Sequence, residues 1–327
     1  MTLSTEKLLS AIDSRRTVPI AWGTVWLLSL VALVMREPDR SVVGTLPADT
    51  PLWQSRVIIY LLHSAATLLS CILLIHLNNT CNLMQRRTWL PATTLLFLNL
   101  CNPAFADRPN TALLLSPLLV VWLYLLFTSY QKEGREAAYG IGLLTTACTL
   151  LWPPAAAMIV ALGTGPAYMQ NLTWKSATAF LLGIATPVWL LFVANIIFDL
   201  HLYYTFDQFV SYIPGLPYSL QADDPTALVG YGMAALIGVS CCLSGNYLIT
   251  RHKIQIWRSN RFLLLLLLFI LAAALLNPDR TADFLPWIHI VTAQASAYYL
   301  IHARNRYAPW QACVVVAAYL LLYIWNF

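Results

Sequence analysis

The chain has 327 residues, of which 59% are hydrophobic and 10% are charged, and its mean hydropathy is +0.66. Soluble domains carry about 25% charged residues, so this composition excludes an ordinary soluble protein. The formal net charge of +5 does not indicate a nucleic-acid partner, because the sequence has no basic run interleaved with aromatic residues. The composition therefore predicts an all-α, polytopic protein whose surroundings are the lipid bilayer.

The N-terminal segment is polar and lacks the apolar centre of a signal peptide, so we expect residues 1–17 to be a cytoplasmic N-terminus. Beyond it, apolar runs predict about ten or eleven membrane spans in one integral-membrane domain, residues 1–327. The longest segment expected outside the bilayer is 199–226. The expected spans are 18–35, 57–77, 90–104, 112–130, 139–151, 154–166, 177–198, 226–249, 262–276, 285–302 and 309–326.

Prolines interrupt the apolar runs at two places. The third span stops at Asn102-Pro103, and only Trp152-Pro153-Pro154 separates the fifth span from the sixth. Proline lacks a backbone donor and disfavours helix in the residue before it. We therefore expect broken helices or re-entrant hairpins there. Irregular backbone at membrane depth needs protein or water to satisfy it, so these breaks are candidate cavity walls.

The distribution of charged residues predicts the orientation of the spans. With the N-terminus inside, five of the 19 basic residues fall on the outer side: Arg36, Arg40, Arg56, Arg108 and Arg280. Four of the 14 acidic residues fall on the inner side: Glu6, Asp13, Glu133 and Glu136. Because basic residues gather on the cytoplasmic side, the sequence predicts a multi-pass membrane protein with a cytoplasmic N-terminus. The family resemblances given below imply that this membrane is the bacterial inner (cytoplasmic) membrane.

Carboxylates and arginines recur beside prolines at the outer ends of three spans. The three motifs are Glu37-Pro38-Asp39-Arg40, Asp107-Arg108-Pro109 and Asn277-Pro278-Asp279-Arg280. A carboxylate there can serve as a general base or hold a divalent cation, and an arginine can bind a phosphate through two parallel hydrogen bonds. The motifs predict a shared polar pocket. Its candidate catalytic residues are Asp39, Glu37 and Asp107. Its candidate substrate-binding residues are Arg40, Arg108, Asp279 and Arg280.

A structural interpretation of the same motifs stays open. An aspartate at a helix start accepts hydrogen bonds from backbone N–H groups, and Asp-Arg beside proline is a common turn. Exposed ion pairs at loop ends are frequent and contribute little stability.

The expected outer loop 199–226 is rich in tyrosine and phenylalanine and contains Asp207. One interpretation is a lid that binds a sugar or a lipid chain, with Asp207 as a further substrate-binding candidate. The alternative is an aromatic belt at the membrane interface.

Other reactive side chains give weaker indications. His63 and His289 lie inside apolar runs, where a histidine is either a functional group or a hydrogen-bonded residue of the bundle interior. The seven cysteines include no C-x-x-C pair, so we expect them to act as small apolar residues. The sequence has no Walker, H-E-x-x-H or G-x-S-x-G motif in a usable context, which argues against nucleotide hydrolysis by this chain alone.

Three stretches of the chain resemble a family of bacterial membrane proteins of unknown activity, found mostly in the Bacteroidota. They are RRTWLPATTLLFLNLCNPAFADRPNTALLLSPLLVVWLYLLF, YGIGLLTTACTLLWPPAAAMIVALG and ADFLPWIHIVTAQASAYYL. The resemblance covers most of the chain and implies a shared fold, but it brings no established reaction.

A more distant resemblance is to the GT-C class of integral-membrane glycosyltransferases. Glu37 and Asp39 stand where that class has an acid after its first span, and Asp107 stands where it has one before a later helix. The resemblance implies a GT-C-like scaffold in which one acid is the catalytic base and the others hold a polyprenyl-phosphate sugar or its metal. The sequence departs from that class in its short first outer loop and in lacking the lysine near the fifth-span break.

The leading hypothesis is an inner-membrane protein of cell-envelope glycan or lipid-linked sugar metabolism. If it is an enzyme, we expect a glycosyltransferase that uses a polyprenyl-phosphate sugar donor at the outer face. Its metal is not identified by the sequence, and a divalent cation is the expectation. The alternatives are a non-catalytic scaffold or assembly partner of an envelope complex, and a transporter or flippase.

Overall fold

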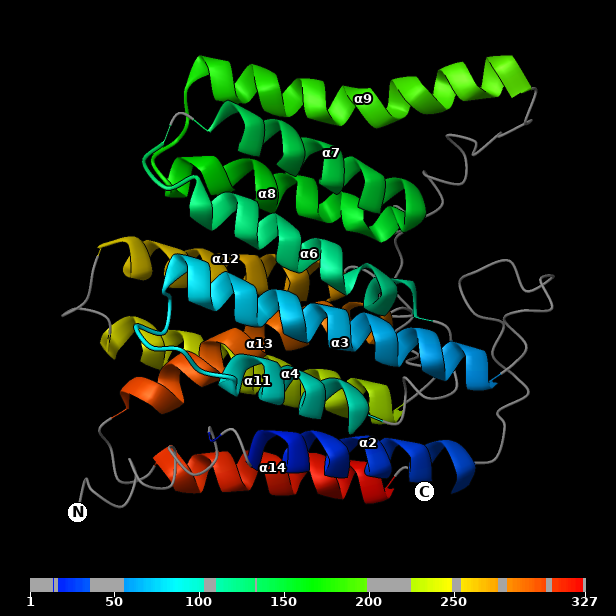
Figure 1. Ribbon diagram of the computed structural model, residues 1–327, viewed down its shortest axis with the longest axis vertical. Helices are drawn as coiled ribbons and strands as arrows, with labels where there is room; N and C mark the ends of the chain where they lie inside the picture. Colours follow the sequence, from blue (N-terminus) through cyan, green and yellow to red (C-terminus); the bar gives the residue numbers. More distant parts are fainter. Residues whose placement is uncertain are drawn as a thin grey trace.

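The computed structural model describes residues 14, 17–35, 56–102, 110–132, 134–198, 225–248, 254–275, 281–303 and 308–325. Within these residues all regular secondary structure is helical, which confirms the all-α prediction (Figure 1). The helices are α2 (Thr17–Met35), α3 (Arg56–Cys81), α4 (Leu90–Leu100), α6 (Thr111–Thr128), α7 (Arg135–Leu151), the 3-10 helix η1 (Pro153–Ala156), α8 (Ala157–Tyr168), α9 (Trp174–Phe198), α11 (Pro225–Leu248), α12 (Ile254–Leu275), α13 (Thr281–His302) and α14 (Ala308–Trp325).

Five of these helices, α3, α6, α9, α11 and α12, are long and apolar enough to cross a membrane. Shorter apolar helices occur at Thr17–Val31, Leu90–Leu100 and Gln311–Leu321. The chain is therefore a multi-pass membrane protein, and the larger expected number of spans stays a prediction.

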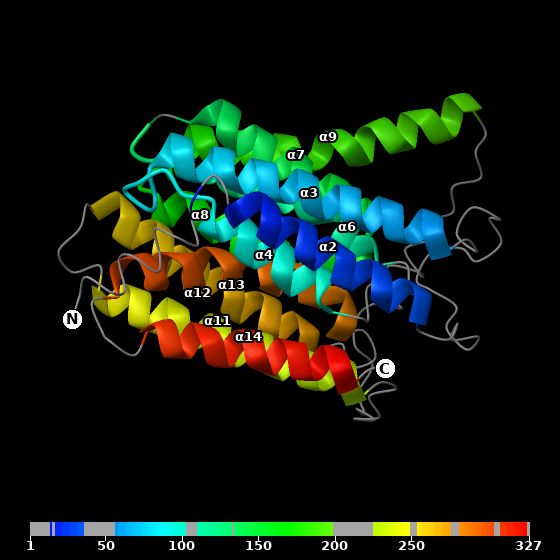
Figure 2. The same ribbon diagram turned by 60° about the horizontal axis from the view of Figure 1, so that its bottom comes forward.

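The helices lie side by side with their axes roughly aligned, so the bundle has two ends (Figures 1 and 2). We call one the amide end: it carries the connections at 81–89, 129–134 and 169–173, which are rich in asparagine and glutamine. We call the other the proline end: there α4 stops, α6 starts and α7 turns into η1. Of the lysines and arginines in the described residues, Arg56 begins α3 at the proline end and the rest lie toward the amide end. In the orientation expected from the sequence the amide end would face the cytoplasm, and that orientation stays a prediction.

Helix α13 is at the centre of the bundle and packs against α4, α6, α11 and α12. Its residues from Phe284 to Ala295 are buried on every side of the helix. A helix that is apolar all round is stable only when other helices or lipid surround it. The other helices of the main core are therefore arranged around α13.

Helix α9 lies at the edge of the bundle and packs mainly against α7 (Figure 1). The two helices approach closely at two glycines: a Cβ on Gly183 would collide with the Tyr139 carbonyl oxygen, and one on Gly142 with that of Phe180. Small residues allow such close backbone contact between membrane helices. Most other side chains of α9 are exposed or half-buried, and only 6% of its most apolar stretch is fully buried.

Both predicted breaks are present. Helix α4 has 11 residues and ends at Leu100, just before Asn102. Helix α7 ends at Leu151, Trp152 adopts an extended conformation, and η1 leads into α8. Because Gln131 N–H donates to the Met169 carbonyl at 3.2 Å, the start of α7 and the end of α8 meet at the amide end. Helices α7 and α8 therefore form a hairpin whose turn contains Trp152.

The predicted start of one span needs correction. The sequence placed a span at 262–276, but α12 begins at Ile254. Its first two turns contain Arg258 and Arg261, which hydropathy assigns to a loop. Arg258 donates to the Tyr168 carbonyl oxygen at 3.2 Å, and the Arg261 guanidinium lies 3.7 Å from the centre of the Trp257 ring. These contacts let the helix extend beyond its apolar part.

Candidate functional site at the proline end

The eight predicted site residues lie outside the described residues. They are Glu37, Asp39, Arg40, Asp107, Arg108, Asp207, Asp279 and Arg280. Their roles as catalytic or substrate-binding groups stay predictions. The aromatic loop 199–226 is likewise described only from Pro225 onward.

The structure does place the helix ends from which three of these acids extend. Met35 ends α2, Asn110 precedes α6 and Thr281 begins α13. Helix α2 packs on α4, and α13 packs on both α4 and α6. In the sequence, Asp39, Asp107 and Asp279 are four, three and two residues from these helix ends.

His63 fixes the start of α6, directly after the Asp107-Arg108-Pro109 motif. The Asn110 N–H donates to His63 Nε2 at 3.1 Å, and Asn110 Oδ1 accepts from the Leu113 N–H at 2.9 Å. Asn110 is therefore the N-cap of α6. Since Nε2 accepts, His63 carries its proton on Nδ1. His63 is a hydrogen-bonded histidine of the bundle interior, as one interpretation of the sequence held.

His289 forms a second buried polar cluster, about 12 Å along α13 from its first residue. Its ring is fully buried: Nδ1 lies 2.8 Å from Asn99 Oδ1, and Nε2 lies 3.4 Å from the Tyr319 hydroxyl. The amide oxygen accepts only, so Nδ1 donates to Asn99 and Nε2 accepts from Tyr319. Asn99 Nδ2 is buried without an acceptor in the part of the chain that the structure describes.

An aromatic cluster closes the turn of the α7–α8 hairpin against α13. The Trp152 ring lies 4.9 Å from that of Phe284 and 5.1 Å from that of Trp287. Trp287 Nε1 donates to the Ala112 carbonyl at 2.9 Å, which ties α13 to the first turn of α6. The Trp152 indole nitrogen is a second buried donor that finds no acceptor among the described residues.

The break beside Trp152 is closely packed. The sequence predicted that this break forms the wall of a cavity, but the cavity next to it is small. The cavity next to it measures about 20 Å³ and is lined by Thr145, Cys148, Ala155 and other, mostly apolar side chains. That is room for about one water molecule. Aromatic rings from α13 occupy the space that the irregular backbone was expected to leave open.

At the proline end, two hydrogen-bonded pairs of imidazole and asparagine groups, His63 with Asn110 and His289 with Asn99, therefore lie between the helices. Asp283, in the first turn of α13, is the described carboxylate nearest in the sequence to the predicted site residues. In the described ranges no group of three His, Cys, Asp or Glu side chains could hold a metal ion.

Sequence reasoning did not identify Asn99 or Asn110 as part of this end. Asparagine inside or next to an apolar run is the signal that marks them, because an amide in a membrane needs a polar partner.

Comparisons with protein-family models, with curated proteins and with solved structures found no match for this chain.

Proposed function

We propose that the protein acts at the proline end on a lipid-linked phosphate substrate, as a glycosyltransferase of cell-envelope glycan metabolism with a GT-C-like scaffold. One observation supports this most directly: the helices that border the three acid-arginine motifs in the sequence belong to one packed group, in which α2 packs on α4 and α13 packs on both α4 and α6. Chemistry on a lipid-linked phosphate requires charged groups at the lipid–water boundary.

In this proposal Asp39 is the general base. It takes the proton from an acceptor hydroxyl, whose oxygen attacks the anomeric carbon of the donor sugar. The bond from that carbon to the phosphate oxygen breaks, and the polyprenyl phosphate leaves with the electron pair. Arg40, Arg108 and Arg280 stabilise the negative charge on the phosphate. Glu37 and Asp107 bind the substrate, and no step is assigned to a metal.

The test is a double variant, Asp39→Asn with Asp107→Asn, compared with a deletion strain at matched protein abundance. Envelope glycolipids are measured by mass spectrometry. We expect the double variant to reproduce the glycolipid defect of the deletion. Glu136→Gln, at the amide end in the first turn of α7, is the matched control and should behave as wild type. If the double variant has normal glycolipids while the deletion does not, these acids do not carry the reaction.

A specific observation also favours the second candidate, an assembly partner of an envelope complex. Helix α9 presents Leu182, Trp189 and Phe192 outward, and each is more than 60% exposed. The double variant Trp189→Ala with Phe192→Ala keeps this surface of α9 apolar but removes two bulky aromatic rings that a partner could contact. In an assembly partner this pair reproduces the deletion phenotype, whereas Leu321→Ala on exposed α14 does not. In an enzyme that acts alone, neither change affects glycolipids.

A further inference from the structure

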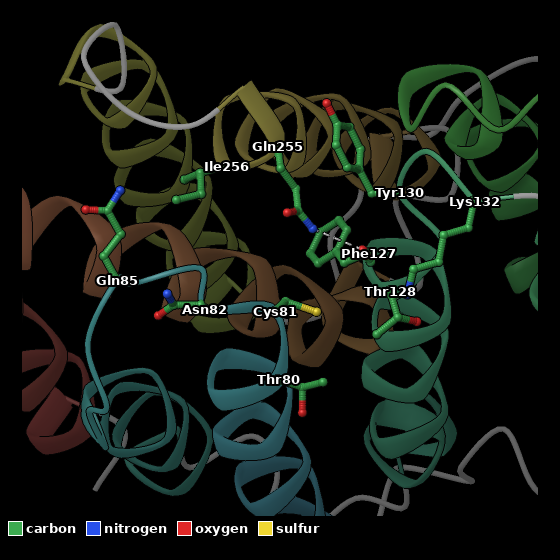
Figure 3. Close-up of a pocket in the computed structure, with 10 residues that line it drawn as sticks. All are labelled: Thr80, Cys81, Asn82, Gln85, Phe127, Thr128, Tyr130, Lys132, Gln255 and Ile256. Atoms are coloured by element: carbon green, nitrogen blue, oxygen red, sulfur yellow. Dashed lines mark hydrogen bonds between the residues drawn. The ribbon is translucent and has the colours of Figure 1, made fainter.

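A cavity of about 400 Å³ lies at the amide end, opposite to the proposed active site (Figure 3). It is an open cavity formed by the last turns of α3 and α6, the connections that follow them and the first turn of α12. Phe127 and Ile256 contribute buried apolar surface to its wall. Its polar lining includes the amides of Asn82, Gln85 and Gln255. With room for a group larger than water, the cavity is a candidate binding site.

Among the described lining residues, the charged side chain is Lys132. Figure 3 shows it running back along the end of α6 toward Thr128, so that its ammonium approaches the cavity. The ammonium makes no hydrogen bond or ion pair with a described residue. Among the described residues, the remaining polar lining groups are amides, hydroxyls and the Cys81 thiol, with neither aspartate nor glutamate in that set. The lining is therefore suited to an anion.

The carbonyl groups at the end of α6 do not require Lys132, because other donors bond to them. The Leu126 carbonyl accepts from the Ser129 N–H at 3.3 Å and from the Ser129 hydroxyl at 2.7 Å. The Phe127 carbonyl accepts from Gln255 Nε2 at 3.4 Å. These bonds satisfy carbonyls that a lysine commonly caps. The Lys132 charge is thus available to a ligand.

The backbone around the cavity is held in an unusual conformation. The four non-glycine residues with positive φ in the described part of the chain all lie at the amide end: Asn82 (49°), Gln85 (56°), Gln131 (54°) and Gln170 (55°). Asparagine adopts this region fairly often, but glutamine does so rarely. Such residues gather at binding sites, where the surrounding structure maintains the strain. Two of the four line the cavity.

Hydrogen bonds between loops make one side of the cavity rigid. The side-chain amides of Gln131 and Gln170 lie 3.1 Å apart, which joins the loop after α6 to the loop after α8. In the orientation that satisfies it, the Gln170 amide oxygen accepts from Arg258 Nη2 at 2.6 Å. Arg258 of α12 donates to the Tyr168 carbonyl at 3.2 Å, which joins the same loop to α12. Lys132 directly follows Gln131. These bonds hold the backbone of Lys132 in position before any ligand binds.

We propose that this cavity binds an anionic phospholipid headgroup, with its phosphate at the Lys132 ammonium and the Gln255 amide. The amides of Asn82 and Gln85, on the opposite side of the cavity from Lys132, contact the other polar atoms of the headgroup (Figure 3). A lipid is the favoured source because the lining residues are the last of two apolar helices and the first of a third, and headgroups surround a membrane protein where its spanning helices end. The site is independent of the proposed glycosyl transfer, which belongs to the other end.

The thiol of Cys81, which lines the cavity, reports its occupancy. The intact protein is placed in bilayers of phosphatidylcholine alone or of phosphatidylcholine with phosphatidylglycerol. Its reaction with N-ethylmaleimide is followed by mass spectrometry. At about ten times the dissociation constant, the bound lipid should slow the labelling of Cys81 about tenfold. Exposed Cys313 on α14, in the same molecule, should react equally fast in both bilayers.

Two charge variants test the role of the lysine. Lys132→Gln should abolish the protection of Cys81. Lys175→Gln, which removes an exposed charge from the first turn of α9 outside the cavity, should preserve it. Both side chains are exposed, so both variants should fold, and the unchanged labelling rate of Cys313 verifies this.

A second arm distinguishes the source of the phosphate. Inorganic phosphate is added to the protein in phosphatidylcholine alone. No effect of the added phosphate, together with protection by phosphatidylglycerol, supports a lipid site. Protection by inorganic phosphate alone overturns the lipid and leaves a soluble phosphate ligand. The inference of an anion site fails if neither probe slows Cys81 labelling, or if Lys132→Gln is protected as well as wild type.

Discussion

The two ends of the bundle satisfy their polar groups in different ways. At the amide end, short connections place asparagine and glutamine side chains against helix-end carbonyls, as in the contact of Gln255 with Phe127. At the proline end, the polar groups lie deeper, between helices, as in the contact of His289 with Asn99. A substitution at the amide end should therefore act locally, whereas one at the proline end should disturb the packing of several helices.

The largest effect is expected for His289→Ala. This change removes two hydrogen bonds, leaves a cavity in the most buried helix and strands the Asn99 amide oxygen. We expect a loss of about 3 kcal/mol in unfolding free energy, mostly from the cavity. Denaturant unfolding of the detergent-solubilised protein measures it. His76→Ala, at an exposed position of α3, is the control. Equal losses for the two variants would contradict the view that the buried cluster organises the proline end.

A second change tests whether helix α9 can be loosened without affecting the proline end. Gly183→Ala introduces a Cβ against the Tyr139 carbonyl, so α9 must move away from α7. Forced packing of this kind costs about 2 kcal/mol. Gly232→Ala on α11 is the matched control, because its Cβ would meet no atom within 4 Å. Hydrogen exchange should increase in 169–173 but not near Asn110. Faster exchange at both ends would show that the ends are coupled.

A smaller effect is expected at the N-cap of α6. Asn110→Ala removes the acceptor for the Leu113 N–H but keeps the backbone contact with His63. Loss of such a cap costs about 1 kcal/mol. Asn110→Ser should restore most of it, since serine is also a good cap. Thermal unfolding measured by tryptophan fluorescence distinguishes the two. If serine is no better than alanine, the Asn110 side chain has another role.

The smallest effect should have the opposite sign. Gln85 has a φ of 56°, which glycine adopts without a steric penalty. Gln85→Gly should stabilise the protein by about 0.5 kcal/mol, because relief of strain outweighs the added flexibility of the unfolded chain. The same variant should weaken anion protection of Cys81, since it removes one amide from the cavity. If stability increases while the anion still protects Cys81 as well as in the wild type, the Gln85 amide does not bind the anion.

The sequence alone determined the helical class, the multi-pass character and the positions of both breaks. These features depend largely on the local sequence: an apolar run partitions into the bilayer, and proline disfavours helix in the residue before it. Proline alone does not fix a break, since α6, α8, α9 and α13 each contain one inside the helix. The start of α12 was missed for a related reason. Hydropathy marks the apolar part of a helix, which can be shorter than the helix itself. Arg258 and Arg261 lie in the first two turns of α12, before its apolar part begins.

Only the tertiary structure decided which polar residues meet. His289 and Asn99 are 190 residues apart, and Asn110 and His63 are 47 apart. The cavity at the amide end takes its lining from three separate segments. In a soluble protein, an amphipathic pattern would show which face of each helix is buried. In a membrane, lipid-facing and buried faces are both apolar, so the rotation of each helix is set by packing and by the few polar contacts themselves.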